Sequence, residues 1–246
     1  MSIAQYIDHT NLKATATQQD IANLCEEAIE HRFRAVCVNS QWVDLARACL
    51  FGTDIKIAAV IGFPLGANHL AVKVYESQIA ANCGARELDV VWNIGKFKEE
   101  KYLQVMKELQ EIVDTVHAIG VLVKVIVETC YLSYDEIVQA HQIVKDSGAF
   151  CIKTSTGAGL EGAEYPTVLT WRELGGLQIK ASGGIHTLAQ VSNFIEVGAD
   201  IIGTSHGVSI LQEPEDEVKS KGPGQGDLVH FDFICGVKPL ELKDEA

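Results

Sequence analysis

The chain has 246 residues, a formal net charge of −13 and 47% apolar residues. This length suits one large domain, because single α/β barrels commonly contain about 250 residues. The negative charge makes nucleic acid and anionic membrane surfaces unfavourable partners, because both repel an acidic protein. No apolar stretch approaches the roughly 20 residues of a membrane-spanning helix, so we expect no membrane segment.

Cysteine usage and the first residues indicate the compartment. The seven cysteines are odd in number and show no C-x-x-C spacing, which is typical of reduced thiols and not of a disulfide framework. Met1–Asp8 contains neither the basic segment nor the apolar run of a signal peptide. We therefore expect a cytoplasmic protein.

Short strand-like runs alternate with longer helical patterns along most of the chain. The expected strands are residues 6–10, 34–39, 55–61, 87–91, 121–128, 150–154, 177–181 and 200–203. The expected helices are residues 17–31, 41–51, 68–83, 98–119, 134–147, 164–174, 187–197 and 206–212. In the third helix, Leu70, Val74, Ile79 and Ala80 favour one face, whereas Lys73 belongs to the polar residues.

Glycines and capping residues mark the boundaries of these elements. The glycines that fall where a helical pattern ends and a strand follows are Gly84, Gly120, Gly148 and Gly198. Glycine can adopt the left-handed conformation that ends a helix. Ser133-x-x-Glu136 and Thr187-x-x-Gln190 are capping-box patterns. A strand–helix unit thus recurs about eight times, which predicts an α/β fold, a single (β/α)₈ TIM barrel.

We assign residues 1–212 to this barrel and residues 213–246 to a short C-terminal tail. The tail is acidic and then rich in Lys, Gly and Pro, so we expect it to be partly mobile, although residues 230–236 are apolar enough to dock. The alternative fold is an open doubly wound sheet. Such a sheet normally has a Gly-rich nucleotide loop after its first strand, and Thr10–Lys13 does not resemble one.

Strand parity places charged side chains inside the barrel. Successive side chains alternate between the two faces of a strand, and we expect the apolar residues on the outer face, which packs against the helices. The charged residues left on the inner face are Asp8, Asp89, Lys124, Glu128, Lys153 and Lys180. Barrel interiors usually hold branched apolar side chains, and a buried ion pair rarely improves stability over an apolar core.

Two readings of these charges remain. Satisfied ion pairs can explain Lys124, Glu87 and Glu128. For Lys153, Lys180 and Asp89 we favour a functional role, because they lie near the strand ends where barrel active sites form.

About one lysine in 10³ is uncharged at neutral pH. Two ammonium groups about 5 Å apart repel by roughly 3 kcal/mol at an effective dielectric of about 20, or about two pKa units. Repulsion and desolvation together could bring one amine toward the neutral nucleophile that a Schiff base needs.

Glycine-rich turns follow the seventh and eighth strands. They read Ser182-Gly183-Gly184-Ile185 and Gly203-Thr204-Ser205-His206, and each precedes a helix. Backbone N–H groups in such turns can hold a phosphate, and phosphate sites after these two strands recur in this fold. The predicted phosphate-binding residues are Gly157, Gly183, Gly184, His186, Gly203 and Ser205.

Seven motifs between residue 8 and about residue 211 resemble those of the deoxyribose-phosphate aldolase family, which consists of class I aldolases with a (β/α)₈ fold. The motifs are Asp8-His9-Thr10, Val36-Cys37-Val38-Asn39, Val60–Gly66, Glu87–Gly95, Val123–Thr129, Ile152–Gly157 and Lys180–Ile185.

The resemblance implies reversible cleavage of 2-deoxy-D-ribose 5-phosphate to acetaldehyde and D-glyceraldehyde 3-phosphate. Lys153 would form the Schiff base, Lys180 would lower its pKa and share in proton transfer, and Asp89 would act through a water molecule. The residues that match the relay and the substrate pocket are Lys124, Asp8, Thr10, Cys37 and Thr156. No metal and no cofactor are implied, and the eight histidines show no ligand spacing, which argues against a metal-dependent class II aldolase.

The sequence departs from the family at the phosphate end. His186 replaces a usual arginine, His206 replaces a usual small serine, and Ala158–Tyr165 differs from the usual continuation. An unperturbed histidine is half-protonated near pH 6.5. We therefore expect phosphate binding that is weaker and falls from pH 6 to 8. The alternative is that backbone N–H groups at Gly184 and Ser205 carry the phosphate alone.

Two other functions remain open from the sequence. One is a different Schiff-base aldolase barrel, which would share the lysine but not the paired Lys153 and Lys180 with Asp89. The other is a non-catalytic barrel scaffold. The expected partners are small aldehydes and sugar phosphates, and for self-association the candidates are a homodimer and a homotetramer.

Overall fold

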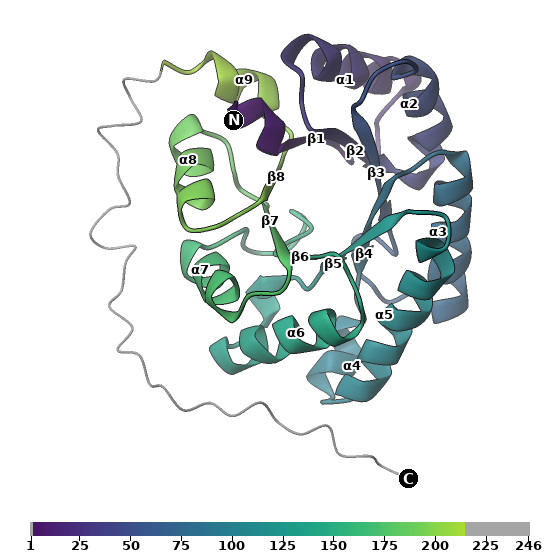
Figure 1. Ribbon diagram of the computed structural model, residues 1–246, viewed down its shortest axis with the longest axis vertical. Helices are drawn as coiled ribbons and strands as arrows, with labels where there is room; N and C mark the ends of the chain where they lie inside the picture. Colours follow the sequence, from purple (N-terminus) through teal and green to yellow (C-terminus); the bar gives the residue numbers. More distant parts are fainter. Residues whose placement is uncertain (1, 215–246) are drawn as a thin grey trace.

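A computed structural model describes residues 2–214 of the chain. Within them, eight parallel strands pair in sequence order and close into one barrel, with β1 hydrogen-bonded to β8 (Figure 1). The strands are β1 (Ile7–Asn11), β2 (Ala35–Asn39), β3 (Lys56–Ile61), β4 (Glu87–Val91), β5 (Leu122–Ile126), β6 (Cys151–Lys153), β7 (Gln178–Ser182) and β8 (Ile201–Thr204). The predicted (β/α)₈ TIM barrel is confirmed.

Helices surround the barrel as an outer ring (Figure 1). They are α1 (Gln18–His31), α2 (Val43–Cys49), α3 (Leu70–Cys83), α4 (Ile94–Lys98), α5 (Tyr102–His117), α6 (Tyr134–Asp146), α7 (Tyr165–Leu174), α8 (Leu188–Glu196) and α9 (Gly207–Gln212). Short 3₁₀ turns lie at Ile3–Tyr6, Ser40–Trp42 and Thr129–Tyr131. Both predicted capping boxes form, at Ser133 and at Thr187, and the four helix-ending glycines have positive φ angles.

The helix predicted over residues 98–119 is present as α5, which is shorter at both ends, but the short helix α4 before it was not predicted. A turn in which Glu100 has a φ of 58° separates α4 from α5. Asn93 begins α4 by accepting a hydrogen bond from the Lys96 N–H at 3.0 Å. The turn between α4 and α5 contains no glycine or proline, so no local residue pattern separates the two helices.

The polar face predicted for α3 was also wrong. Lys73 is fully buried, and its Nζ donates to Glu108 Oε1 at 2.8 Å and to the Val91 carbonyl oxygen at 3.0 Å. Ile79, predicted to face the core, is 42% exposed. The contact between Lys73 and Glu108 of α5 is a tertiary interaction that hydrophobic periodicity within α3 does not report.

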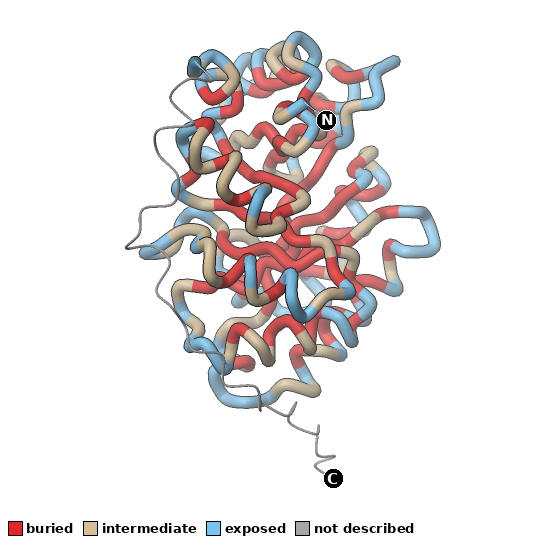
Figure 2. Tube along the Cα trace, turned by 60° about the vertical axis from the view of Figure 1, so that its left-hand side comes forward, coloured by how far each residue is buried: buried red, intermediate tan, exposed pale blue. Residues whose placement is uncertain are grey.

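The apolar core lies mainly between the strands and the helices, and Figure 2 shows the buried residues concentrated at the centre of the molecule. The outward strand residues that pack in it include Val36, Val38, Leu88, Val90, Val123 and Val125. A much smaller apolar cluster, Cys37, Ala58 and Val60, lies on the inner face. Strand parity is therefore confirmed, and it leaves the inner face for polar groups.

The described residues end just after the barrel. Glu213, the first residue assigned to the tail, accepts a hydrogen bond from the Leu188 N–H at the start of α8 at 2.8 Å. The rest of the predicted tail from residue 215, including the apolar residues 230–236, lies outside the described residues.

Candidate active site

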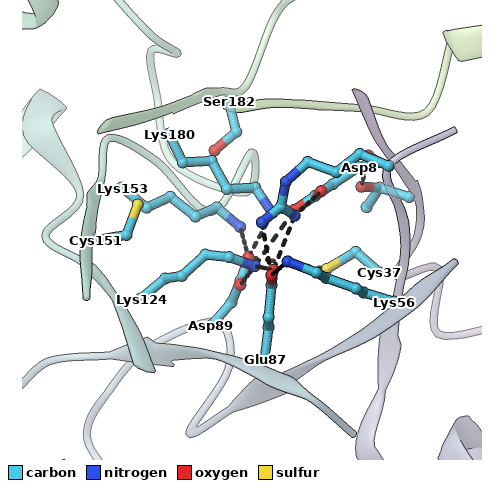
Figure 3. Close-up of polar contacts among 12 residues, drawn as sticks. Asp8, Cys37, Lys56, Glu87, Asp89, Lys124, Cys151, Lys153, Lys180 and Ser182 are labelled. Carbon is cyan, nitrogen blue, oxygen red and sulfur yellow. Dashed lines mark hydrogen bonds and ion pairs between the residues drawn. The ribbon is translucent and has the colours of Figure 1, made fainter. Parts of the chain in front are cut away.

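Four neighbouring strands bring the key charged residues together in two adjacent pairs. Asp89 in β4 is the register partner of Lys124 in β5, and Lys153 in β6 is the register partner of Lys180 in β7. Side chains of register partners in parallel strands project from the same face of the sheet. In Figure 3 the three lysines and the carboxylate converge on the barrel axis.

Asp89 lies at the centre of the cluster (Figure 3). Its Oδ2 accepts hydrogen bonds from Lys153 Nζ and Lys180 Nζ, each at 2.8 Å, and its Oδ1 accepts from Lys124 Nζ at 2.9 Å. The two lysine nitrogens on Oδ2 can therefore be no farther apart than the sum of those two distances. This geometry agrees with the close approach that the sequence argument assumed.

A second carboxylate, Asp8 from β1, binds three cations. Its Oδ2 accepts from Lys180 Nζ at 2.5 Å and from Lys124 Nζ at 3.3 Å. Its Oδ1 accepts from Arg34 Nη1 at 2.7 Å. Asp8 thus joins the lysines of β5 and β7 to a guanidinium that precedes β2.

The charge network continues to the amino-terminal ends of the strands. Glu87 pairs with Arg34 through two contacts of 2.6 and 2.9 Å, with Lys124 at 2.5 Å and with Lys56 at 3.2 Å. Sequence reasoning missed Arg34, because parity assigned its position to the outer face together with Val36. The long side chain of Arg34 instead reaches carboxylates on two other strands.

The network fixes the charge states of its members. Burial alone would raise the pKa of Asp89, but the three surrounding lysines hold that pKa well below its ordinary value. Burial alone would lower the pKa of Lys180, but Asp8 and Asp89 outweigh it and raise that pKa. The two carboxylates offset the repulsion between the ammonium groups that was expected from the sequence, so Lys180 remains a fixed cation beside Lys153.

A pocket of about 570 Å³ opens above this cluster. Lys153 is only 3% exposed but borders the pocket, whereas Asp8, Asp89, Lys124 and Lys180 are fully buried. Of the predicted site residues, those that line the pocket are Thr10, Lys153, Thr156, Gly157, Gly183, Gly184, His186, Gly203 and Ser205. Cys37 is fully buried, with its Sγ 3.9 Å from Asp89 Oδ2.

Glu128 occupies a different place from the one predicted. It was expected among the interior charges, but it follows the end of β5 with a φ of 54°, and its carboxylate binds Thr156. The nearly buried carboxylate accepts from the Thr156 N–H at 3.2 Å and from the Thr156 hydroxyl group. Glu128 therefore anchors the loop that follows Lys153.

The loops after β6 and β7 pack tightly against each other. A Cβ atom on Gly162 would lie 2.1 Å from the Gly183 carbonyl oxygen, which also accepts a hydrogen bond from the Ala163 N–H at 3.1 Å. A Cβ atom on Gly203 would lie 3.0 Å from Lys180 Cε. Glycine at these positions allows the loops after β6 and β7 to approach each other, and β8 to approach Lys180, more closely than a larger residue would.

Two histidines from neighbouring loops meet at the rim of the pocket. Nδ1 of His186, after β7, lies 3.0 Å from Nδ1 of His206, after β8. The two rings are perpendicular, with centroids 4.3 Å apart. The sequence placed both residues at the phosphate end, but it gave no signal that they contact each other.

A closed parallel barrel whose interior is filled with ionisable groups, under a pocket that Lys153 borders, has the architecture of a TIM-barrel enzyme. The family model of the DeoC/LacD family aldolases matches residues 2–213. The chain therefore belongs to the DeoC/LacD aldolase family, and it is an aldolase, a lyase of the carbon–carbon bond.

The similar proteins agree with this assignment. The deoxyribose-phosphate aldolase of Aciduliprofundum boonei is 49% identical over 215 residues, which cover 87% of this chain and 97% of that protein. The enzyme of Thermococcus kodakarensis is 49% identical over 219 residues, covering 87% and 98%. The tetrameric deoxyribose phosphate aldolase structure from Aeropyrum pernix shares 33% identity, with a TM-score of 0.80 over 85% of this chain and 89% of that chain. The resemblance seen in the sequence is confirmed.

Two further properties concern the described part of the chain. Within residues 2–214, no group of three or more His, Cys, Asp and Glu side chains is arranged to hold a metal ion. No helix in the same range is long and apolar enough to cross a membrane.

Proposed function

We propose that this aldolase reversibly cleaves 2-deoxy-D-ribose 5-phosphate to acetaldehyde and D-glyceraldehyde 3-phosphate, through a Schiff base on Lys153. The supporting observation is that Lys153 borders the pocket while its amine shares one Asp89 oxygen with Lys180. The names of the relatives at 49% identity support the substrate.

In the cleavage direction, the uncharged Lys153 amine adds to the substrate aldehyde, and loss of water gives an imine. Removal of the proton from the C3 hydroxyl breaks the C2–C3 bond and releases D-glyceraldehyde 3-phosphate. The bond electrons remain as an enamine on Lys153. Protonation of that enamine and addition of water then release acetaldehyde and restore the amine.

The residues around Lys153 support this chemistry by charge and position. Lys180, held as a cation, shares one Asp89 oxygen with Lys153 and so would place a fixed positive charge beside the reacting amine. Asp89 accepts a hydrogen bond from the Lys153 amine at 2.8 Å, so it can exchange protons there directly or through a water molecule. Lys124, bound to the other oxygen of Asp89, would belong to the same proton relay.

The opposite end of the pocket would hold the substrate. Backbone N–H groups of the loops at Gly183, Gly184 and Ser205 would bind the phosphate. Thr10 and Thr156 would lie along the sugar, and Thr156 has a fixed orientation because its hydroxyl group donates to Glu128. Asp8 and Cys37 would shape the inner wall.

This class I chemistry needs neither a metal nor an organic cofactor, because the protonated imine formed on the lysine accepts the electrons of the breaking C–C bond. The partners would be small aldehydes and sugar phosphates. We also propose a homo-oligomer, in line with the tetrameric structure of the Aeropyrum pernix protein. The cytoplasmic location remains a prediction.

Trapping with acetaldehyde and borohydride tests the proposal. Reduction of the imine should leave an ethyl group on Lys153, located by peptide mass mapping. Lys153→Arg should abolish both the adduct and the cleavage of deoxyribose 5-phosphate. Lys101→Arg is the matched control, because Lys101 is exposed and forms a surface salt bridge with Glu99. An adduct on Lys180, or no adduct on any lysine, would contradict the proposal.

A further inference from the structure

The pair formed by His186 and His206 can hold a limited number of protons. Only one hydrogen fits between two Nδ1 atoms that lie 3.0 Å apart, so one ring donates and the other accepts. In the neutral pair, the accepting ring carries its own hydrogen on Nε2. One additional proton can be accommodated while the contact is kept. A second additional proton would put a hydrogen on both facing Nδ1 atoms, so neither ring could accept and the contact would be lost.

The surroundings favour His206 as the acceptor. Partial burial lowers the pKa of His206, and the positive charges of His186 and Lys13 lower it further. Ser205 Oγ lies 3.2 Å from the same Nδ1 atom, and the His206 N–H donates to Thr204 Oγ1 at 3.0 Å. His186 then donates across the contact, and the pair as a whole can take up one additional proton.

The neighbouring charged groups do not compensate for that proton. The His186 N–H donates to the neutral side chain of Gln190 at 2.8 Å. The carboxylates that line the same pocket have other partners, because Asp20 accepts from Thr17 and Glu27 contacts His9 at 2.6 Å. Glu213 accepts from the Leu188 N–H. A bound dianion would therefore be the natural counter-charge.

We propose that His186 and His206 form a proton-storing pair that determines the specificity for phosphorylated substrate. The pair takes up one proton when a dianionic phosphate group enters between the loops after β7 and β8. The inference rests on the proposed function, whose substrate carries that phosphate group. Unphosphorylated deoxyribose would bind without this proton, so discrimination between the two substrates falls as the pH rises.

Inorganic sulfate is the appropriate probe, because it stays dianionic between pH 6 and pH 8 and does not titrate itself. Calorimetry should give a Kd that rises about tenfold over this range, because histidine loses its charge there. Titrations in buffers of different ionisation enthalpy should show uptake of up to one proton in the wild type. Uptake approaching two protons, or a Kd constant within about twofold, would overturn the proposal.

Variants separate the pair from the rest of the pocket. His186→Arg supplies a permanent cation, so sulfate binding should become independent of pH. His186→Gln should lower the affinity at pH 6 to the wild-type value at pH 8, and it serves if the arginine does not fit. His117→Gln, at the exposed end of α5, is the matched control and should keep the wild-type pH dependence. A wild-type pH dependence in His186→Gln would contradict the proposal.

The two proposals can fail separately. Trapping of acetaldehyde on Lys153 involves no phosphate, so it reports on the proposed function alone. Sulfate binding involves no catalysis, so it reports on the histidine pair alone. The ratio of kcat/KM for deoxyribose 5-phosphate to that for deoxyribose should fall about tenfold from pH 6 to pH 8 in the wild type and stay level in His186→Arg.

Discussion

The interior charge cluster and the phosphate-end loops are built on opposite principles. In the cluster, Asp89 is fully buried and has three lysine partners. The register of β4 against β5 fixes its side chain on the inner face of the barrel, opposite Lys124. At the phosphate end, His186 and His206 depend on one contact between two exposed loops. A change in the cluster should therefore affect both stability and chemistry, whereas a change in the loops should tune affinity.

The largest effect should follow from Asp89→Asn. The substitution leaves three buried lysines without their shared counter-ion, and removing one partner of a buried ion pair typically costs about 3–5 kcal/mol. Loss of the proton acceptor of Lys153 should lower kcat about 10³-fold as well. Urea denaturation and steady-state kinetics measure the two effects. Glu99→Gln, on the surface, is the control, and a fully active Asp89→Asn enzyme would refute the assigned role.

The same residue predicts the acid limit of stability. The folded-state pKa of Asp89 lies well below its ordinary value, so its contribution is complete above the unfolded-state pKa of about 3.9. That contribution is lost as the pH falls through the folded-state pKa. The unfolding free energy of the wild type should thus decrease below about pH 4, with a shallower decrease in Asp89→Asn. Parallel stability curves for the two proteins would contradict this account.

A second buried ion pair separates stability from chemistry. Lys73 and Glu108 join α3 to α5 behind the barrel, away from the pocket. Lys73→Met should lower the unfolding free energy by about 3 kcal/mol, because Glu108 remains buried and keeps only its longer salt bridge of 3.3 Å to Lys96 within the described residues. The kcat of the folded enzyme should stay within about twofold. The double variant Lys73→Met/Glu108→Leu should recover most of the stability, and failure to recover would mean that the pair is not the cause.

The interior of the barrel could be predicted from the sequence. The alternation of apolar and charged side chains along β4, β5 and β6 puts Asp89, Lys124 and Lys153 on the inner face. The helices were less predictable. Lys73 looked solvated because hydrophobic periodicity carries no information about a charged partner on another helix. Arg34 was missed for the same reason, since its carboxylate partners lie on two other strands.

Loop contacts were the least predictable part of the site. Glu128 follows the inward parity of β5, but the strand ends two residues earlier and a left-handed residue redirects the side chain to Thr156. The contact between His186 and His206 depends on the paths of two loops, which carry no periodic signal. Residue types in these loops indicate a ligand class, whereas the contacts between them require the folded chain.

Glu128→Gln tests whether a loop anchor can be altered without disturbing the cluster. Losing the charged acceptor for Thr156 should cost about 1.5–3 kcal/mol in that interaction, which corresponds to a decrease in kcat/KM of about 10- to 100-fold. We expect most of it as a higher KM, with acetaldehyde trapping on Lys153 unchanged. Thr156→Val should reproduce the effect and Thr156→Ser should not. Loss of trapping would instead place Glu128 within the catalytic cluster.

The smallest expected effect concerns Thr187, which forms the capping box that begins α8 next to His186. Its hydroxyl group accepts from the Gln190 N–H at 3.2 Å. Thr187→Ala should lower the unfolding free energy by about 1 kcal/mol, the usual cost of a lost helix cap. Thr187→Ser keeps the cap and should match the wild type. Gln190 still accepts the hydrogen bond of the His186 N–H in this variant, so the affinity for sulfate should change by less than about threefold. A larger change would show that the cap, and not the histidine pair, sets the loop geometry.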